Sequence, residues 1–170
     1  MLKNAILYVD DLKKKMYETW YDEKYKYYNI NPYNFQFDVS ENTYEQNQFV
    51  SVNSKNEIVG FISYKLDRMA NAVIELGVIN FSDDKITFGK DLAQAIREIF
   101  LKFHFNKIIF SVVVGNPIEK QYNKLIEKYG GRIVGIYYDD VKLFDGKLYD
   151  RQLYELLRKD FINSLEYINY

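Results

Sequence analysis

Residues 115–131, GNPIEKQYNKLIEKYGG, predict a helix with both ends marked in the sequence, directly after the apolar run KIIFSVVV. Asn116 suits the N-cap, the following proline suits the first helical position, and Glu119 can reach back to the amide of the cap. Gly130–Gly131 supply a left-handed stop. Backbone N–H groups at such a helix start point outward and favour anions or carbonyl oxygens, so this turn is a candidate binding site.

The same region contains a strand–helix–strand unit. The apolar runs 72–81 and 107–114 predict buried strands, and the helical spacing of apolar residues in 90–103 predicts the helix between them. Strands joined in this way are parallel, with a right-handed crossover, and ligands bind outside their carboxyl ends. The loop 80–89, NFSDDKITFG, and the cap at Asn116 are therefore expected to lie side by side at one cleft.

The remaining patterns predict antiparallel strands around this unit. They give a helix at 10–28, a loop at 29–47 with a short extended piece in FQFDV, strands at 48–52 and 58–66, and a hairpin of 132–144 with 147–157 around the turn DG. The predicted fold class is α/β (α+β): a mixed, mostly antiparallel sheet with a central parallel βαβ unit and flanking helices.

Composition narrows the functional classes. At 170 residues we expect a single domain. Lys plus Arg at 23 nearly balances Asp plus Glu at 24, so no basic field is available for a nucleic acid. The absence of cysteine removes disulfides and thiolate metal sites, and we expect no metal. The run AILYV is too short to cross a membrane, so we expect a cytoplasmic protein with no membrane partner.

The order of these elements, together with several short motifs, resembles the GNAT superfamily of N-acetyltransferases, with the closest likeness to the branch that includes ribosomal-protein N-terminal acetyltransferases. The resemblance covers about residues 48–158 and leaves 1–47 as a variable acceptor-side region. The matching motifs are EIVGFI at 57–62, IELGVI at 74–79, GN at 115–116, EKYGGRIVG at 127–135 and DGKLYDRQLYELLR at 145–158.

The resemblance implies that acetyl-CoA is the cosubstrate and that its pantetheine arm pairs with the strand end at Val78, Ile79 and Asn80. It also implies contacts of CoA with Asn116, and a pyrophosphate loop at Thr87, Phe88, Gly89 and Lys90. This loop departs from the family pattern, because Thr87 stands where a second glycine is expected. Three carboxylates, Asp83, Asp84 and Asp91, are close enough in sequence to repel a pyrophosphate, which Lys85 and Lys90 would partly offset.

Acyl transfer needs a neutral amine, a polarised thioester carbonyl and a proton for the departing thiolate. Glu75, in the middle of an apolar strand, is the candidate base, because a carboxylate in a cleft gains basicity on desolvation. The alternative is a strand residue that faces solvent or pairs with a lysine. Tyr122 is the candidate acid, and its alternative is a core tyrosine, since the chain contains 17 tyrosines.

The predicted function is therefore transfer of an acetyl group to a primary amine, either a protein N-terminus or a small molecule, by direct attack in a ternary complex. A second hypothesis keeps the fold without the reaction, as a GNAT-like module that binds a protein or a small ligand. The sequence leaves the acceptor open, and it leaves a monomer and a homodimer equally possible.

Overall fold

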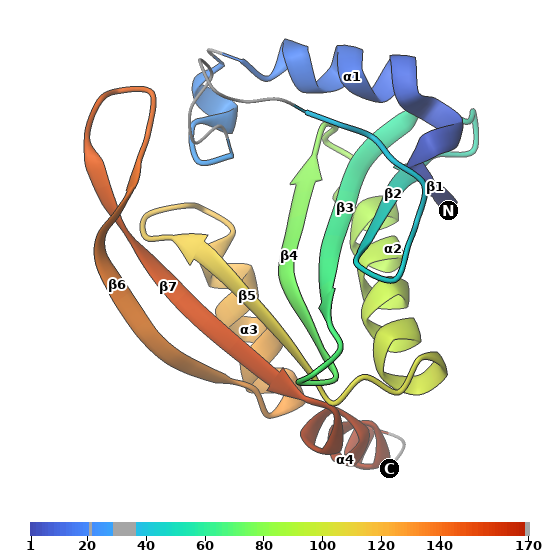
Figure 1. Ribbon diagram of the computed structural model, residues 1–170, viewed down its shortest axis with the longest axis vertical. Helices are drawn as coiled ribbons and strands as arrows, with labels where there is room; N and C mark the ends of the chain where they lie inside the picture. Colours follow the sequence, from blue (N-terminus) through green and yellow to red (C-terminus); the bar gives the residue numbers. More distant parts are fainter. Residues whose placement is uncertain (21, 29–36, 169–170) are drawn as a thin grey trace.

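The computed structural model describes residues 1–20, 22–28 and 37–168, which form one mixed sheet with helices on both faces (Figure 1). The strand order is β1-β2-β3-β4-β5-β7-β6. The strands are β1 (Leu2–Asn4), β2 (Gln46–Val52), β3 (Ile58–Asp67), β4 (Ala72–Asn80), β5 (Lys107–Val113), β6 (Arg132–Lys142) and β7 (Leu148–Leu157). The helices are α1 (Val9–Glu18), α2 (Lys85–Arg97), α3 (Glu119–Tyr129) and α4 (Arg158–Ile168), with shorter helical turns η1 (Ala5–Tyr8), η2 (Glu23–Tyr25) and η3 (Glu98–Lys102).

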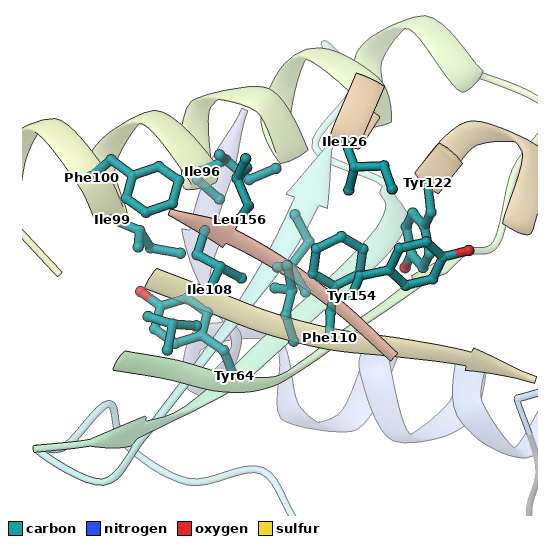
Figure 2. Packing of buried hydrophobic residues seen from close by; sticks show 14 of the residues in the cluster. Tyr64, Ile96, Ile99, Phe100, Ile108, Phe110, Tyr122, Ile126, Tyr154 and Leu156 are labelled. Carbon is teal, nitrogen blue, oxygen red and sulfur yellow. The ribbon is translucent and has the colours of Figure 1, made fainter. Parts of the chain in front are cut away.

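The two faces of the sheet bury separate cores, because side chains alternate along each strand. On β3, Ile62 and Tyr64 join the core beneath α2, α3 and α4, whereas Phe61 joins the core beneath α1. Figure 2 shows the larger core, in which the Phe110 and Tyr154 rings stack with centroids 5.0 Å apart. Among the described residues, no helix is long and apolar enough to cross a membrane.

Helix α2 packs closely on the sheet at a glycine. A Cβ atom on Gly60 of β3 would overlap the ring of Phe88, and it would also lie 2.9 Å from the carbonyl oxygen of Ile79. Phe88 is buried in the larger core. The glycine therefore sets how near the first turns of α2 come to β3 and β4.

The expected parallel pair is confirmed, but it is short. In the described pairing, β4 and β5 match only at Ala72↔Lys107 and Val73↔Ile108. Beyond Val73 the two strands spread apart toward their carboxyl ends (Figure 1). β5 pairs along its whole length with β7 instead.

A β-bulge accounts for this divergence. Ser63 pairs with Gly77 and Lys65 with Ile74, so Glu75 and Leu76 together face a single residue of β3. Glu75 has a φ of 52°, in the left-handed region that residues other than glycine rarely adopt. Because a bulge bends and twists its strand, β4 turns away from β5 at this point.

Several elements differ from the sequence prediction. The helix predicted at 10–28 ends at Glu18, where the hydroxyl of Thr19 donates a 2.7 Å hydrogen bond to the carbonyl of Met16. Strand β1 and helix α4 were not predicted, because the first has three residues and the second lies beyond the family-like region. Residues 29–36 of the predicted loop lie outside the described residues, and 37–45 contain no strand.

Candidate active site

The gap between β4 and β5 leads to a cavity of about 290 Å³. Its walls come from β4, β5, α2 and α3, the elements of the βαβ unit and the helix that follows it. The apolar lining is Leu76, Val78, Leu92, Ile96, Phe110, Ile118, Tyr122, Leu125 and Tyr129. The polar lining comes from α3 alone, as Gln121, Lys124 and Lys128. The cavity thus suits a ligand with a long, mostly apolar stem.

The end of β4 provides an open strand edge beside this cavity. The described pairing with β5 stops at Val73, which leaves the edge of 74–80 facing the gap. Val78 lines the cavity and Ile79 is buried in the core beneath α1. The side-chain oxygen of Asn80 accepts a 3.0 Å hydrogen bond from the amide of Ser82. An extended ligand with amide groups can pair with such an edge as an added strand does.

Tyr122 is buried in the wall of the cavity. Its ring packs edge-on against Phe110 and Tyr154, with centroid distances of 4.9 and 5.8 Å (Figure 2). Burial raises the pKa of the Tyr122 hydroxyl, and the nearby Tyr28 and Tyr154 raise it further. The hydroxyl therefore stays protonated at neutral pH and can donate a hydrogen bond. Tyr122 is thus a core residue, as its alternative predicted, and it also lines the cavity.

Glu75 does not line the cavity, whereas its neighbour Leu76 does. The Glu75 side chain is 61% exposed, and its carboxylate lies 2.7 Å from the ammonium of Lys65 on β3. The burial that was expected to increase its basicity is therefore missing. Glu75 does sit two residues past the last β4–β5 pair, at the bulge where the gap opens.

The predicted pyrophosphate loop is wrong in its structure, because α2 begins five residues earlier than expected, at Lys85. Asp84 is its N-cap, and the carboxylate accepts a 2.9 Å hydrogen bond from the amide of Thr87. Phe88 is a core residue, while Gly89 and Lys90 are exposed on the helix. Apart from the adjacent residues and the nearby backbone of its own helix, nothing lies within 4 Å of a Cβ built on Gly89, so packing requires no glycine there.

The amides at the start of α2 are engaged within the chain. The Lys85 amide donates to the carbonyl of Asp83, and the Phe88 amide to the carbonyl of Asp84. Hydrogen bonds with the side chain and the backbone amide of Thr87 lower the pKa of Asp84. A hydrogen bond from the Ile86 amide lowers this pKa further. A pyrophosphate would have to displace this carboxylate. In this structure the amides at the first turn of α2 therefore already have acceptors within the chain.

Asp91 points away from the cavity. Its carboxylate is buried, accepts a 2.6 Å hydrogen bond from the Ser51 hydroxyl and lies 2.7 Å from the N-terminal ammonium of Met1. The expectation that Asp91 repels a phosphate at the start of the helix is therefore wrong, because it packs against β2.

The backbone amides of the turn before α3 also have acceptors within the chain, like those at the start of α2. The buried Asn116 accepts a 3.1 Å hydrogen bond from the amide of Ile118, and its own amide donates to Val113. Glu119 accepts a hydrogen bond of 3.1 Å from Gly115, one residue before the predicted partner. These amides serve the turn itself, so the expected outward-pointing cluster is not formed. Helix α3 begins at Glu119, with Ile118 in the N-cap position and no side-chain cap, so the prediction of Asn116 as its N-cap is wrong. Asn116 closes the turn before the helix instead.

Residues 22–28 bridge the two sides of the gap, which the sequence did not indicate. The Tyr25 hydroxyl donates a 3.4 Å hydrogen bond to the carbonyl of Phe81, just beyond β4. The Lys26 ammonium lies 3.0 Å from the carboxylate of Asp145 in the β6–β7 turn. Hydrogen bonds from Tyr149, a backbone amide and Lys26 lower the pKa of Asp145 to about 2. This segment therefore reaches from the carboxyl end of β4 to the β6–β7 turn.

No family model and no curated protein sequence matches the chain. Several solved structures are similar to the chain in fold. A spermidine N-acetyltransferase from Vibrio cholerae, in complex with CoA and spermine, has a TM-score of 0.73 at 17% identity, over 96% of this chain and 98% of that one. A chimera of the Vibrio cholerae and human enzymes has a TM-score of 0.65 at 16% identity, over 96% and 99% of the two chains. A probable acetyltransferase has a TM-score of 0.57 at 18% identity, over 68% and 64%.

These similarities establish the fold. The mixed sheet with its central parallel pair is the GNAT fold, as the sequence motifs predicted. Nothing in the comparisons favours the ribosomal-protein branch that the motifs suggested.

Proposed function

On the GNAT fold, we propose that this chain is an N-acetyltransferase that moves an acetyl group from acetyl-CoA to a primary amine. The observation that carries the proposal is the separation of β4 from β5 after Val73, with a 290 Å³ apolar cavity beside it. The open edge of β4 and the cavity together fit an amide-containing, largely apolar arm. The solved structures of similar fold, one of them with CoA bound, support the same donor.

In the proposed complex, the pantetheine arm lies along Val78, Ile79 and Asn80 and its thioester lies near the bulge. Bound acetyl-CoA supplies the activated acetyl group. The amine nitrogen attacks the carbonyl carbon, the carbon–sulfur bond breaks, and the amine proton passes to the Glu75 carboxylate directly or through water. The ammonium of Lys65 lies 2.7 Å from this carboxylate. The strained backbone at Glu75 fits a functional position, since such outliers gather at active sites.

Tyr122 is proposed to act as a hydrogen-bond donor at the reacting group. Its raised pKa makes full release of the proton unfavourable, so it suits stabilisation of developing negative charge better than complete proton transfer. The thiolate then takes its proton from solvent.

The acceptor is proposed to be a small primary amine. Spermidine and spermine are the first candidates, because they are the acceptors that the names of the similar structures give. The structure provides no observation that favours a protein N-terminus. A panel of spermidine, spermine, simple diamines and an unblocked peptide tests the range.

Binding of the donor is the first test. A ligand at about 100 times its dissociation constant should stabilise the fold by about 2.7 kcal/mol, which a thermal melt detects. We expect acetyl-CoA to raise the melting temperature and desulfo-CoA to compete. Absence of both a melting shift and calorimetric heat at millimolar acetyl-CoA would reject the proposal. Donor binding without turnover on any amine would favour the non-catalytic module instead.

A further inference from the structure

We infer that β6 is the contact strand of a homodimer, in which the β6 strands of two copies of this chain pair antiparallel and join the two sheets into one. This assembly does not depend on the proposed function. Three properties of β6 favour it: a free backbone edge, exposed apolar side chains on both faces, and charges that match when the strand meets its own copy.

The backbone edge of β6 is open. The strand lies at one end of the strand order (Figure 1), and in the part of the chain that the structure describes its only partner strand is β7. Residues 135–137 pair regularly with β7 between two register shifts. Edge strands are commonly protected by Lys or Pro, but the segment 132–138, RIVGIYY, contains neither and has one charge, at Arg132. This segment is therefore available to pair with another strand.

Both faces of the strand expose apolar side chains. Ile136 lies opposite Gln152 of β7 and Tyr137 lies opposite Arg151, so the two side chains point to opposite faces of the sheet. A helix docked on one face would leave the other face exposed, whereas a second strand beside β6 contacts side chains on both. Five residues of the segment are between 42% and 78% exposed: Ile133, Val134, Ile136, Tyr137 and Tyr138.

The strand is also complementary to itself. A two-fold axis at Ile136 sets this side chain opposite Ile136 of the second copy, and it sets Gly135 opposite Tyr137. Apart from its chain neighbours, nothing lies within 4 Å of a Cβ built on Gly135, which leaves room for the tyrosine ring. At each end Arg132 faces Asp140 of the other copy, whereas a parallel arrangement would bring like charges together. The antiparallel dimer is therefore the occupant that fits this edge.

Sedimentation equilibrium tests the assembly. We expect the parent protein to have twice the chain mass of 20.4 kDa at micromolar concentrations. Ile136→Lys sets two ammonium groups opposite each other and should weaken dimerisation at least about tenfold. Tyr138→Lys changes a more exposed side chain, so it should weaken the dimer even if Ile136→Lys fails to fold. The matched control is Leu7→Lys, 70% exposed on η1 beside the opposite edge of the sheet, and it should leave the dimer intact.

Disulfide cross-linking tests the pairing of the two strands, because the chain contains no cysteine. Opposite Cα atoms of an antiparallel pair lie about 4.5–5.5 Å apart, within the range that a disulfide spans. Under oxidising conditions Ile136→Cys should therefore form a covalent dimer on a denaturing gel without reductant. Leu7→Cys should remain a monomer on the same gel.

Three results would overturn the inference. One is a parent protein that sediments as a monomer at every concentration. The second is a dimer that both β6 lysine variants leave unchanged, and the third is an Ile136→Cys variant that cross-links no faster than Leu7→Cys, since each would place the contact on another surface. None of these results bears on acetyl transfer, which the donor-binding experiment tests separately.

Discussion

The carboxylate of Glu75 lies 2.7 Å from the ammonium of Lys65, on the bulge where β4 leaves β5. The contact joins two side chains that are more than half exposed, so it contributes little to stability. Its position matters more, because Glu75 follows the last parallel pair by two residues and adopts a φ of 52°. A charged residue kept in a strained conformation at the opening of the gap is a candidate for chemistry.

Glu75→Gln should lower turnover about tenfold or more while changing the affinity for acetyl-CoA by less than twofold, because a base acts on the amine and not on the donor. Steady-state kinetics across pH 6 to 9 with calorimetric donor binding would measure both effects. The loss should be largest at low pH, where less neutral amine is present. Glu57→Gln, an exposed carboxylate before β3, is the control. Wild-type turnover in Glu75→Gln at every pH would make Glu75 a structural residue.

Tyr122→Phe should reduce turnover by about ten- to a hundredfold with little loss of stability, since the ring and its packing remain. Tyr154→Phe is the matched control in the same aromatic cluster. The Tyr154 hydroxyl donates a 2.9 Å hydrogen bond to Asn123 and accepts one from Gln152, so its loss should cost about 1 kcal/mol of unfolding free energy. Urea denaturation and kinetics on both variants separate the two roles. Equal effects of the two substitutions on turnover would remove Tyr122 from the mechanism.

Gly60→Ala should destabilise the protein by about 1–3 kcal/mol, because the new methyl group overlaps the Phe88 ring. Phe88→Ala should cost about 3–5 kcal/mol through the cavity it leaves. The double variant should be less destabilised than the sum, because the methyl then has room, and a double-mutant cycle by urea denaturation measures the coupling. Strict additivity would show that Gly60 and Phe88 do not contact each other in solution.

The sequence predicted the fold correctly where the turn and cap residues agree with the order of the apolar runs along the chain. The runs that became β2 to β7 are bounded by turn residues, and the helix after β5 ends at Gly130, which has the left-handed φ of 72° that its sequence suggested. The parallel pair followed from the order of strand, helix and strand. The short length of the parallel pair could not be predicted in this way. It depends on the bulge at Glu75, which arises from the pairing of β4 with β3 and is not visible in the residues of β4 alone.

The candidate site was harder to predict for a related reason. Asp84 was interpreted as a carboxylate in a loop, although an Asp three residues before Thr87 is also the signal for a helix cap, and the cap prevails in the structure. Lys124 and Lys128 gave no signal as surface lysines, since only the packing of α3 beside the gap makes them part of a cavity wall. The bridge from Lys26 to Asp145 joins residues far apart in the chain and has no local pattern.

The capping role of Asp84 predicts a pH dependence. Its hydrogen bonds lower its pKa in the folded protein below the ordinary value of 3.8, so the charged carboxylate stabilises the native state. That contribution is complete above the ordinary pKa and declines as the pH falls through the lowered one. The melting temperature of Asp84→Ala should therefore lie below that of the parent by a constant amount from pH 7 to 5, and the difference should shrink below about pH 4. Asp83→Ala, which removes the neighbouring carboxylate without removing the cap, should show a smaller difference at every pH. A deficit in Asp84→Ala that stays constant down to pH 2 would mean that the charge of the cap plays no part in the stability of the fold.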